Sequence, residues 1–203
     1  MDGRSAVWDD RAMTADLPGH PDQVHEAAET VIAFWLGEVP AEKRFVRDSD
    51  IDRICRERFG ATRAAVVDAH GTGWRAEPRT LLAAIILIDQ FSRNIFRGSP
   101  DAYAADPLAR ALAGEGIAHG WGTGMTAEQR QFLHMPLMHS ERMDDQVRSL
   151  ALYRADGGLP YDFARLHAGQ VARFGRFPQR NDVLGRESTA AERAFLSEPG
   201  NEF

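Results

Sequence analysis

Cysteine is nearly absent from this sequence, in which Cys55 is the single example among 203 residues. One thiol excludes an internal disulfide and fits a reducing compartment, so we expect a cytoplasmic location. Cys55 sits in the segment IDRICRERF, whose spacing puts it on the apolar face of a helix. We therefore interpret it as a small core residue.

Long apolar runs and an excess of positive charge are also missing. The longest apolar run, residues 81–88, is far shorter than the roughly 20 residues that cross a membrane. The N-terminal segment MDGRSAVWDDR contains acidic residues and no apolar stretch, unlike a signal peptide. A net charge of −6 argues against general binding to nucleic acids or anionic membranes, so neither is an expected partner.

The alternating pattern of a β-strand is absent as well, and the chain predicts an all-α fold. Helices of about 10–20 residues with short loops indicate about eight antiparallel helices stacked as hairpins. We expect one helical domain over residues 21–203, after a flexible leader over residues 1–20. Thr126 begins a capping box, Pro136 is expected to end or kink that helix, and Ser140 is expected to cap the next.

The most apolar segment, residues 78–97, ends in a polar cluster. Its first half is apolar on every side, which is typical of a helix packed on all faces. Four polar side chains follow one helical turn apart in pairs: Asp89 with Arg93, and Gln90 with Asn94. They form either a wall that faces a ligand or a buried ion pair that fixes helix packing, because a buried charge must be paired.

A second cluster lies on both sides of Pro136 and contains His134, His139, Ser140, Glu141, Asp144, Asp145 and Gln146. Its members His139 and Glu141 fall in a break between two helices. The two form a candidate acid–base pair, although Glu141 also suits the positive end of a helix. His134 and His139 are five residues apart, which is not the spacing that places two imidazoles on one helix face for a metal. We therefore expect no metal site and no cofactor.

A third cluster, near the C-terminus, is rich in arginine. A guanidinium suits carboxylate or phosphate groups, and several arginines in a short stretch of an acidic chain suggest that they bind such a group. The same residues could instead neutralise internal carboxylates and bind nothing. The cluster contains Arg173, Arg176, Arg180, Asn181 and Arg186.

Four segments resemble an uncharacterised, mainly bacterial family known as domain of unknown function 924. The resemblance spans about residues 24–203 and implies a tetratricopeptide-like helical superhelix. It implies no activity, substrate or cofactor. The segments are VIAFWLGE (31–38), LIDQFSRNIFRGSPDAYAAD (87–106), FLHMPLMHSERMDDQVRSLALY (132–153) and FGRFPQRNDVLGRESTAAERAFL (174–196).

Two positions depart from the family pattern. Gln179 stands where relatives commonly carry histidine, and Ser92 stands where proline is frequent. Glutamine can form hydrogen bonds but is neither a base nor a good zinc ligand. Any role of that histidine in relatives would have to be filled differently here.

We hypothesise that the three clusters meet in one partly buried pocket that binds a small anionic ligand. Asp89 would orient Arg93 or Arg176, His139 could change charge near neutral pH, and the C-terminal arginines would attract the anion. The pocket could belong to an enzyme, with His139, Glu141 and Asp89 as catalytic candidates. The alternative is a protein-interaction module that holds a peptide in a helical groove.

Overall fold

The computed structural model describes residues 21–198, and all regular secondary structure in that part is helical. The all-α prediction is therefore confirmed. The predicted leader, residues 1–20, and residues 199–203 lie outside the described part of the chain. No helix within residues 21–198 is both long enough and apolar enough to span a membrane.

Long α-helices alternate with short helical turns. The N-terminal half contains α1 (Pro21–Ile32), the π-helix η2 (Ala33–Glu38), the 3₁₀ turn η3 (Ala41–Lys43), α2 (Ser49–Asp68), α3 (Pro78–Ile85), the π-helix η4 (Ile86–Phe91) and α4 (Ser92–Ile95). The C-terminal half contains α5 (Asp101–Ala104), α6 (Asp106–Ala118), the 3₁₀ turn η5 (Trp121–Gly124), α7 (Ala127–Met138), α8 (Met143–Asp156), α9 (Gly158–Phe174), the 3₁₀ turn η6 (Pro178–Arg180) and α10 (Ala190–Leu196).

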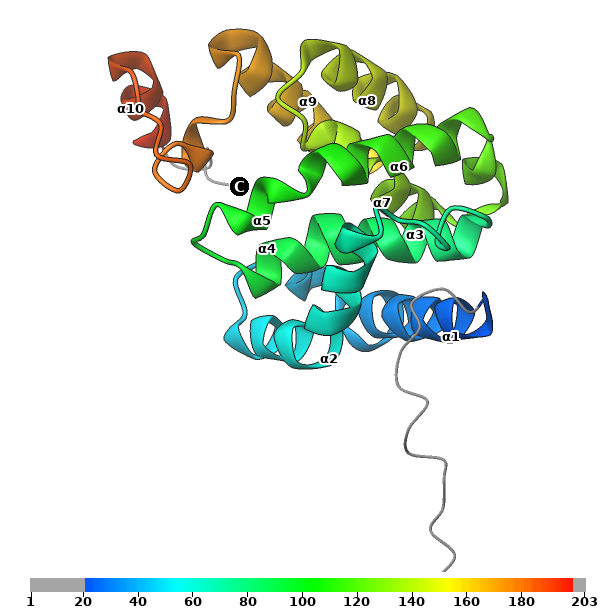
Figure 1. Ribbon diagram of the computed structural model, residues 1–203. Helices are drawn as coiled ribbons and strands as arrows, with labels where there is room; N and C mark the ends of the chain where they lie inside the picture. Colours follow the sequence, from blue (N-terminus) through cyan, green and yellow to red (C-terminus); the bar gives the residue numbers. More distant parts are fainter. Residues whose placement is uncertain (1–20, 199–203) are drawn as a thin grey trace, which may run out of the picture.

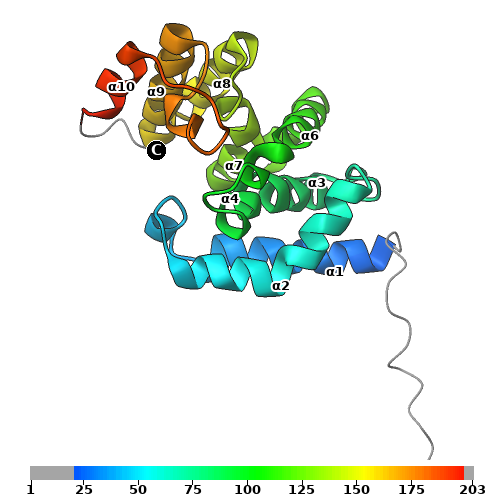
Figure 2. The same cartoon turned by 60° about the vertical axis from the view of Figure 1, so that its left-hand side comes forward.

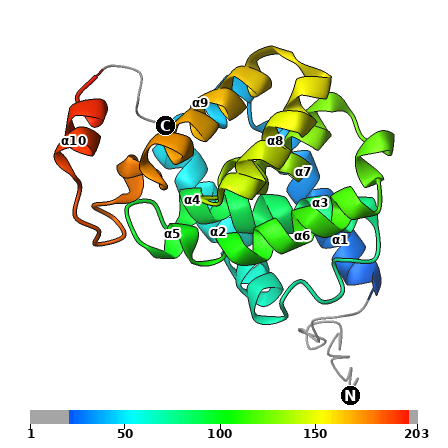
Figure 3. The ribbon, with the colours of Figure 1, turned by 90° about the horizontal axis from the view of Figure 1, so that it is seen from above.

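The helices stack in layers (Figure 1). α1 and α2 form one end of the molecule, α3 and α4 lie on them, and α6 to α9 cover the opposite side, as Figure 2 also shows. Each helix from α6 to α8 packs against the next one in the chain. Seen from above in Figure 3, α10 stands apart from these helices at the side of the molecule. The stacking of consecutive helices is compatible with a tetratricopeptide-like arrangement, which stays a prediction.

The central element is one continuous helix made of α3, η4 and α4. Every side chain from Thr80 to Ser92 is buried, because the sequence there offers apolar groups to neighbours on all sides. η4 is a widened turn, a feature that often marks functional sites in helices. Asp89 and Gln90 lie in this turn, so polar groups enter the core where the helix departs from α geometry.

Aromatic rings fix the central helix to the first layer. Phe91 on η4 is fully buried, and its ring is the meeting point of three others. Its ring centroid lies 4.9 Å from that of Phe59, 5.2 Å from that of Trp35 and 5.8 Å from that of Phe34. Edge-to-face and tilted packing of this kind adds to the hydrophobic stabilisation of the core.

The capping box of α7 is confirmed, because the side chain and backbone of Thr126 both bond to Gln129. Of the two outcomes expected at Pro136, an end of the helix was wrong, since α7 continues to Met138, whereas a kink stays a prediction. Pro136 lies in the last turn, and the helix loses the one hydrogen bond that an N–H at this position would have made to the carbonyl of Phe132. The helix therefore delivers its buried face directly to the break before α8.

The prediction that Ser140 caps the next helix, α8, was wrong. α8 begins at Met143, with Arg142 as its N-cap residue. The Ser140 hydroxyl instead donates a hydrogen bond of 2.7 Å to Asp145 and accepts one of 3.2 Å from the backbone N–H of Arg142. These bonds hold the short connection that carries His139 and Glu141.

Cys55 is confirmed as a core residue, with no exposed surface. Burial, and secondarily the charge of Asp52, raises the pKa of its thiol to about 12. A thiol with such a pKa stays protonated at neutral pH and is a poor nucleophile.

A pair of glycines on α6 gives a test of the packing between layers. A Cβ added at Gly116 would lie 2.7 Å from Cδ2 of Leu81 and 2.9 Å from Cδ1 of Leu133, whereas one at Gly114 would meet nothing within 4 Å. Gly116→Ala should destabilise the protein by about 1–3 kcal/mol through overpacking. Gly114→Ala should stabilise it by up to about 1 kcal/mol through helix propensity.

Urea unfolding at 25 °C, followed by circular dichroism, measures both variants on one scale. Equal or increased stability of Gly116→Ala would contradict the close contact of α6 with α3 and α7.

Candidate functional site

A cavity of about 360 Å³ opens beside the second half of the central helix. Its walls come from the segment 44–47, from Gln90 on η4, from α4 and the turn after it, and from α5. Further lining side chains follow α7, lie on α9 or belong to η6. Among the described residues 21–198, no aspartate or glutamate lines this cavity. The arginine and histidine residues of the lining are Arg44, Arg47, Arg93, Arg97, Arg180, His139 and His167.

The carboxylate of Asp89 lies beneath the cavity and is 1 % exposed. It accepts a hydrogen bond of 2.8 Å from Nδ1 of His139, one of 2.6 Å from Nε2 of Gln90 and a longer one of 3.5 Å from Arg93. Burial alone would raise the pKa of Asp89, but the positive charges of His139 and Arg93 outweigh it and hold this pKa well below its usual range. Asp89 is therefore a carboxylate at neutral pH.

The contact with Asp89 orients the imidazole of His139. Since Nδ1 faces the carboxylate, Nε2 is the nitrogen that remains to meet a ligand, and His139 lines the cavity. An imidazole positioned by a buried carboxylate is the arrangement used for general acid–base catalysis. His167 lies nearby, with 6.0 Å between the two ring centroids. Burial, and secondarily the charge of His139, lowers the pKa of His167 to about 4, so His167 is neutral at pH 7.

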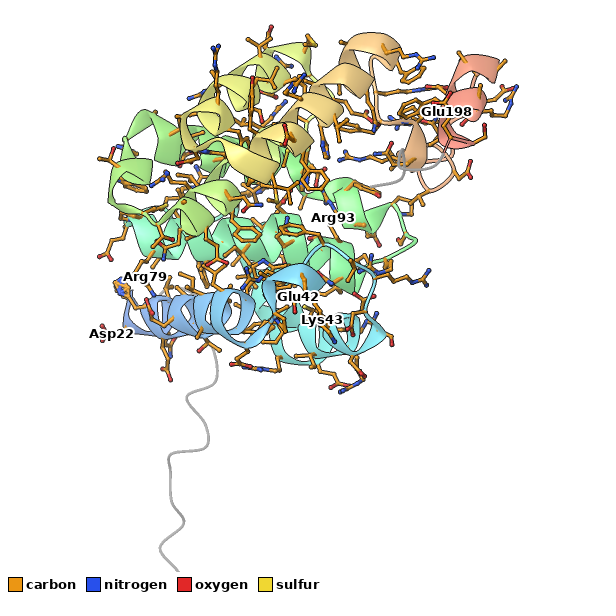
Figure 4. The ribbon with its side chains drawn as sticks, turned by 180° about the vertical axis from the view of Figure 1, so that it is seen from behind. Asp22, Glu42, Lys43, Arg79, Arg93 and Glu198 are labelled. Carbon is orange, nitrogen blue, oxygen red and sulfur yellow. The ribbon has the colours of Figure 1, made fainter. Side chains whose placement is uncertain are left out.

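Two arginines share the carboxylate of Asp106. Arg93 binds it with two hydrogen bonds, of 2.7 and 2.9 Å, and Figure 4 shows Arg93 in the middle of the molecule. Arg180 approaches the same carboxylate to only 3.6 Å. The guanidinium carbon of Arg180 lies 4.7 Å from the ring centroid of Tyr103 and 4.5 Å from that of Phe177, so two aromatic rings flank it.

The two guanidiniums differ in how well their charge is compensated. Burial would lower the pKa of Arg93, but Asp89 and Asp106 outweigh it and raise this pKa. Burial and the neighbouring charge of Arg93 instead lower the pKa of Arg180. Arg180 is 9 % exposed, so a positive charge lies at the cavity wall with an incomplete partner.

Asn94 on α4 and Arg97 in the turn after it line the cavity, and both are also bonded internally. Asn94 donates a hydrogen bond of 2.8 Å to Asp52, and Arg97 donates two, of 2.6 and 2.7 Å, to the same carboxylate. Burial raises the pKa of Asp52, but these donors outweigh it and lower the pKa overall. Ser92 accepts a hydrogen bond of 3.0 Å from Arg63, which gives its hydroxyl a structural role.

Glu141 lies on the other side of the wall formed by His139, Tyr103 and Arg180. A second cavity, of about 490 Å³, is lined by these residues and by Glu141. Arg186 binds Glu141 with hydrogen bonds of 2.7 and 2.9 Å. Burial would raise the pKa of Glu141, but the hydrogen bonds and charge of Arg186 outweigh it and lower this pKa. Glu141 is therefore a paired carboxylate rather than a residue of the arginine-lined cavity.

The C-terminal cluster is divided between the cavity and internal pairs. Arg180 lines the cavity, but Arg176 binds Glu192 with hydrogen bonds of 2.7 and 2.8 Å. Asn181 is fully buried and donates a hydrogen bond of 3.0 Å to Ser188. The partner of Asp89 among the two expected arginines is thus Arg93, and Arg176 instead anchors α10.

Several residues at the cavity were not found from the sequence. Arg97 follows Arg93 by four residues, so a helix that reached Arg97 would have placed both on one face, although α4 ends at Ile95. Nothing in the sequence places the segment 44–47, Tyr103 or His167 beside the central helix. Gln179 also lines the cavity. Its Oε1 is buried and has no hydrogen-bond partner within the described part of the chain.

Metal ligands do not gather in the described structure. Within residues 21–198, no three side chains of His, Cys, Asp or Glu are grouped so that they could hold a metal ion. His134, the other histidine of the second cluster, packs edge-on against Tyr153 with 5.8 Å between ring centroids. Burial lowers the pKa of His134 to about 4.

The buried carboxylate predicts a pH-dependent loss of stability in Asp89→Asn. Leaving His139 and Arg93 without this charge should cost about 3 kcal/mol at pH 7. Because the pKa of Asp89 is lower in the folded protein than its unfolded value of about 3.9, the deficit should be full above that pH and should shrink as the pH falls toward the folded pKa.

Urea unfolding of wild type and variant at several pH values between 3 and 7 measures this deficit as an order-of-magnitude effect. Asp50→Asn is the matched control, since Asp50 is exposed and lies 3.9 Å from Arg53. A deficit that is the same at every pH, or equal to that of the control, would show that the Asp89 charge is not used.

Comparisons with known proteins agree with one another. Residues 31–200 match the family described as Bacterial protein of unknown function (DUF924). A solved structure of a protein of unknown function from Agrobacterium tumefaciens is similar, with a TM-score of 0.82 and 37% sequence identity, over 86% of this chain and 98% of that one. No curated protein matches. The chain therefore belongs to the DUF924 family, which agrees with the resemblance found in its sequence.

Proposed function

We propose that the cavity beside the central helix binds a small organic anion. Its volume falls in the range of about 300–1,000 Å³ that is usual for small-molecule sites. Its lining contains five arginines and two histidines and no carboxylate, although the chain as a whole has a net charge of −6. A cavity of this charge concentrates anions from solution.

Arg180 is the observation that carries the proposal. Arg44, Arg93 and Arg97 each donate to a carboxylate, whereas Arg180 meets Asp106 at 3.6 Å after Arg93 has already bound it twice. Burying a charge costs several kcal/mol unless it is paired and hydrogen-bonded. A carboxylate or phosphate group in the cavity would supply the missing partner, and the two flanking rings hold the guanidinium ready for it.

The pair of Asp89 and His139 supports an enzymatic role for the same site. Their contact of 2.8 Å fixes the ring, and a carboxylate behind an imidazole stabilises the imidazolium that forms when Nε2 takes a proton. His139 would act as the acid or base on a bound anion, with Asp89 as its positioning residue. Glu141, already paired with Arg186, is not needed for this chemistry.

A protein-interaction module is the second candidate, and exposed apolar side chains favour it. These side chains lie on α8 and α9 and do not line the arginine-rich cavity. They are Met143, Val147, Leu159, Phe163 and Leu166. Their position separates the two candidates, because a partner on α8 and α9 would not need Arg180. A cytoplasmic location remains the expectation for either function.

Thermal shift with small anions tests the binding proposal. Phosphate, acetate, succinate, phenyl phosphate and benzoate are compared at constant ionic strength with chloride. At least one organic anion should raise the melting temperature with a saturable dependence on concentration. Arg180→Met, compared with its own ligand-free melting temperature, should weaken binding about tenfold or more, since a charged hydrogen bond is lost.

Arg173→Met is the matched control. Arg173 also stacks on two rings, 4.7 Å from the centroid of Phe174 and 5.6 Å from that of Phe195, but it does not line the cavity. It should keep the full response. If no anion stabilises the wild type beyond the chloride control, the proposal fails and the interaction surface on α8 and α9 becomes the leading candidate.

A further inference from the structure

We infer that the ligand carries a planar apolar group next to its anionic group, and that Phe45 and Val46 select it. This inference rests on the proposed anion-binding function. Both residues line the arginine-rich cavity, yet they are large apolar side chains that are 57 % and 54 % exposed. An inorganic anion alone would leave these surfaces in water.

The segment 44–47 is fixed in place, so the exposure of Phe45 is a feature of the folded state. Arg44 is buried, bonds to Glu128 and donates a hydrogen bond of 3.0 Å to the carbonyl of Leu36. Lys43 binds Asp48 across the segment at 3.1 Å. These contacts tie the start of the segment to η2 and α7, close the segment between Lys43 and Asp48, and hold its two apolar side chains at the cavity.

The ring of Phe45 is already oriented for stacking. It lies nearly parallel to that of Phe132, with an interplanar angle of 10° and 6.1 Å between centroids. Phe132 is 1 % exposed and belongs to the core, so it gives Phe45 a rigid backing. Aromatic rings prefer offset stacked or edge-to-face partners, and a planar group in the cavity would provide one.

The cavity therefore joins two chemistries contributed by different parts of the chain. Phe45 and Val46 come from the segment between η3 and α2, whereas Arg180 comes from η6 and His139 from the end of α7. A ligand that satisfied both would place a carboxylate or phosphate at Arg180 and a ring or other flat apolar group at Phe45. Aryl carboxylates and aryl phosphates are the simplest members of this class.

Titration calorimetry with the full-length protein tests this with two pairs of probes: benzoate against acetate, and phenyl phosphate against inorganic phosphate. The aryl member of at least one pair should bind about tenfold tighter than its partner, from stacking and burial of the ring. Phe45→Ala should abolish that preference and leave the affinity for the small anion within about twofold. Which pair responds distinguishes a carboxylate from a phosphate head group.

Phe163→Ala is the control, because Phe163 is an exposed phenylalanine on α9 that does not line the cavity. Circular dichroism and the melting temperature confirm folding of each variant. Equal affinity for both members of each pair, or an aryl preference that survives Phe45→Ala, would overturn the inference while leaving anion binding intact. The absence of saturable binding of all four probes would overturn both.

Discussion

The site depends on one buried carboxylate. Asp89 sits in the most apolar part of the chain, where an uncompensated charge would cost several kcal/mol, and the fold meets this cost with donors from its own helix and from His139. Asp89 positions His139, and it is one of the two carboxylates that hold Arg93. Arg93 in turn occupies Asp106, and this leaves Arg180 with an incomplete partner at the cavity wall.

The cavity is assembled from segments that are far apart in the sequence and exists only in the folded chain. The central helix and the turn after it supply Arg93 and Arg97, and the connection before α2 supplies the segment 44–47. The later part of the chain supplies His139, His167 and Arg180. Because the central helix is packed on all sides, its widened turn is held rigidly, and the groups that project from it are positioned without a ligand. Such preorganisation lowers the cost of binding.

The sequence specified the fold class and the position of the polar cluster, since both depend on local pattern. An apolar helix with Asp89 and Arg93 one turn apart must lie inside and must find partners, whatever the rest of the chain does. Local pattern does not determine which C-terminal arginine lies at the cavity. Arg176 and Arg180 are equivalent by composition, and only the packing of α10 assigns Arg176 to Glu192 and Arg180 to the cavity.

The residues that distant exposed segments contribute to the cavity could not be predicted from the sequence either, because tertiary packing alone places them there. Phe45 and Val46 lie in a short loop without periodicity, and their position at the cavity follows from the contacts of Arg44 with Glu128 and with the carbonyl of Leu36. The helix boundary at Ser140 was misjudged because a serine can cap a helix or bond elsewhere with equal local propensity. Here the Ser140 hydroxyl donates its hydrogen bond to Asp145, five residues later.

The tautomer of His139 tests the central claim most directly. Long-range proton–nitrogen NMR spectra, recorded where the imidazole is neutral, should place its proton on Nδ1, with Nε2 unprotonated toward the cavity. The same spectrum of Asp89→Asn should show a changed tautomer balance. A proton on Nε2 in the wild type, or a spectrum that the variant does not alter, would show that Asp89 does not hold the imidazole and would contradict the account.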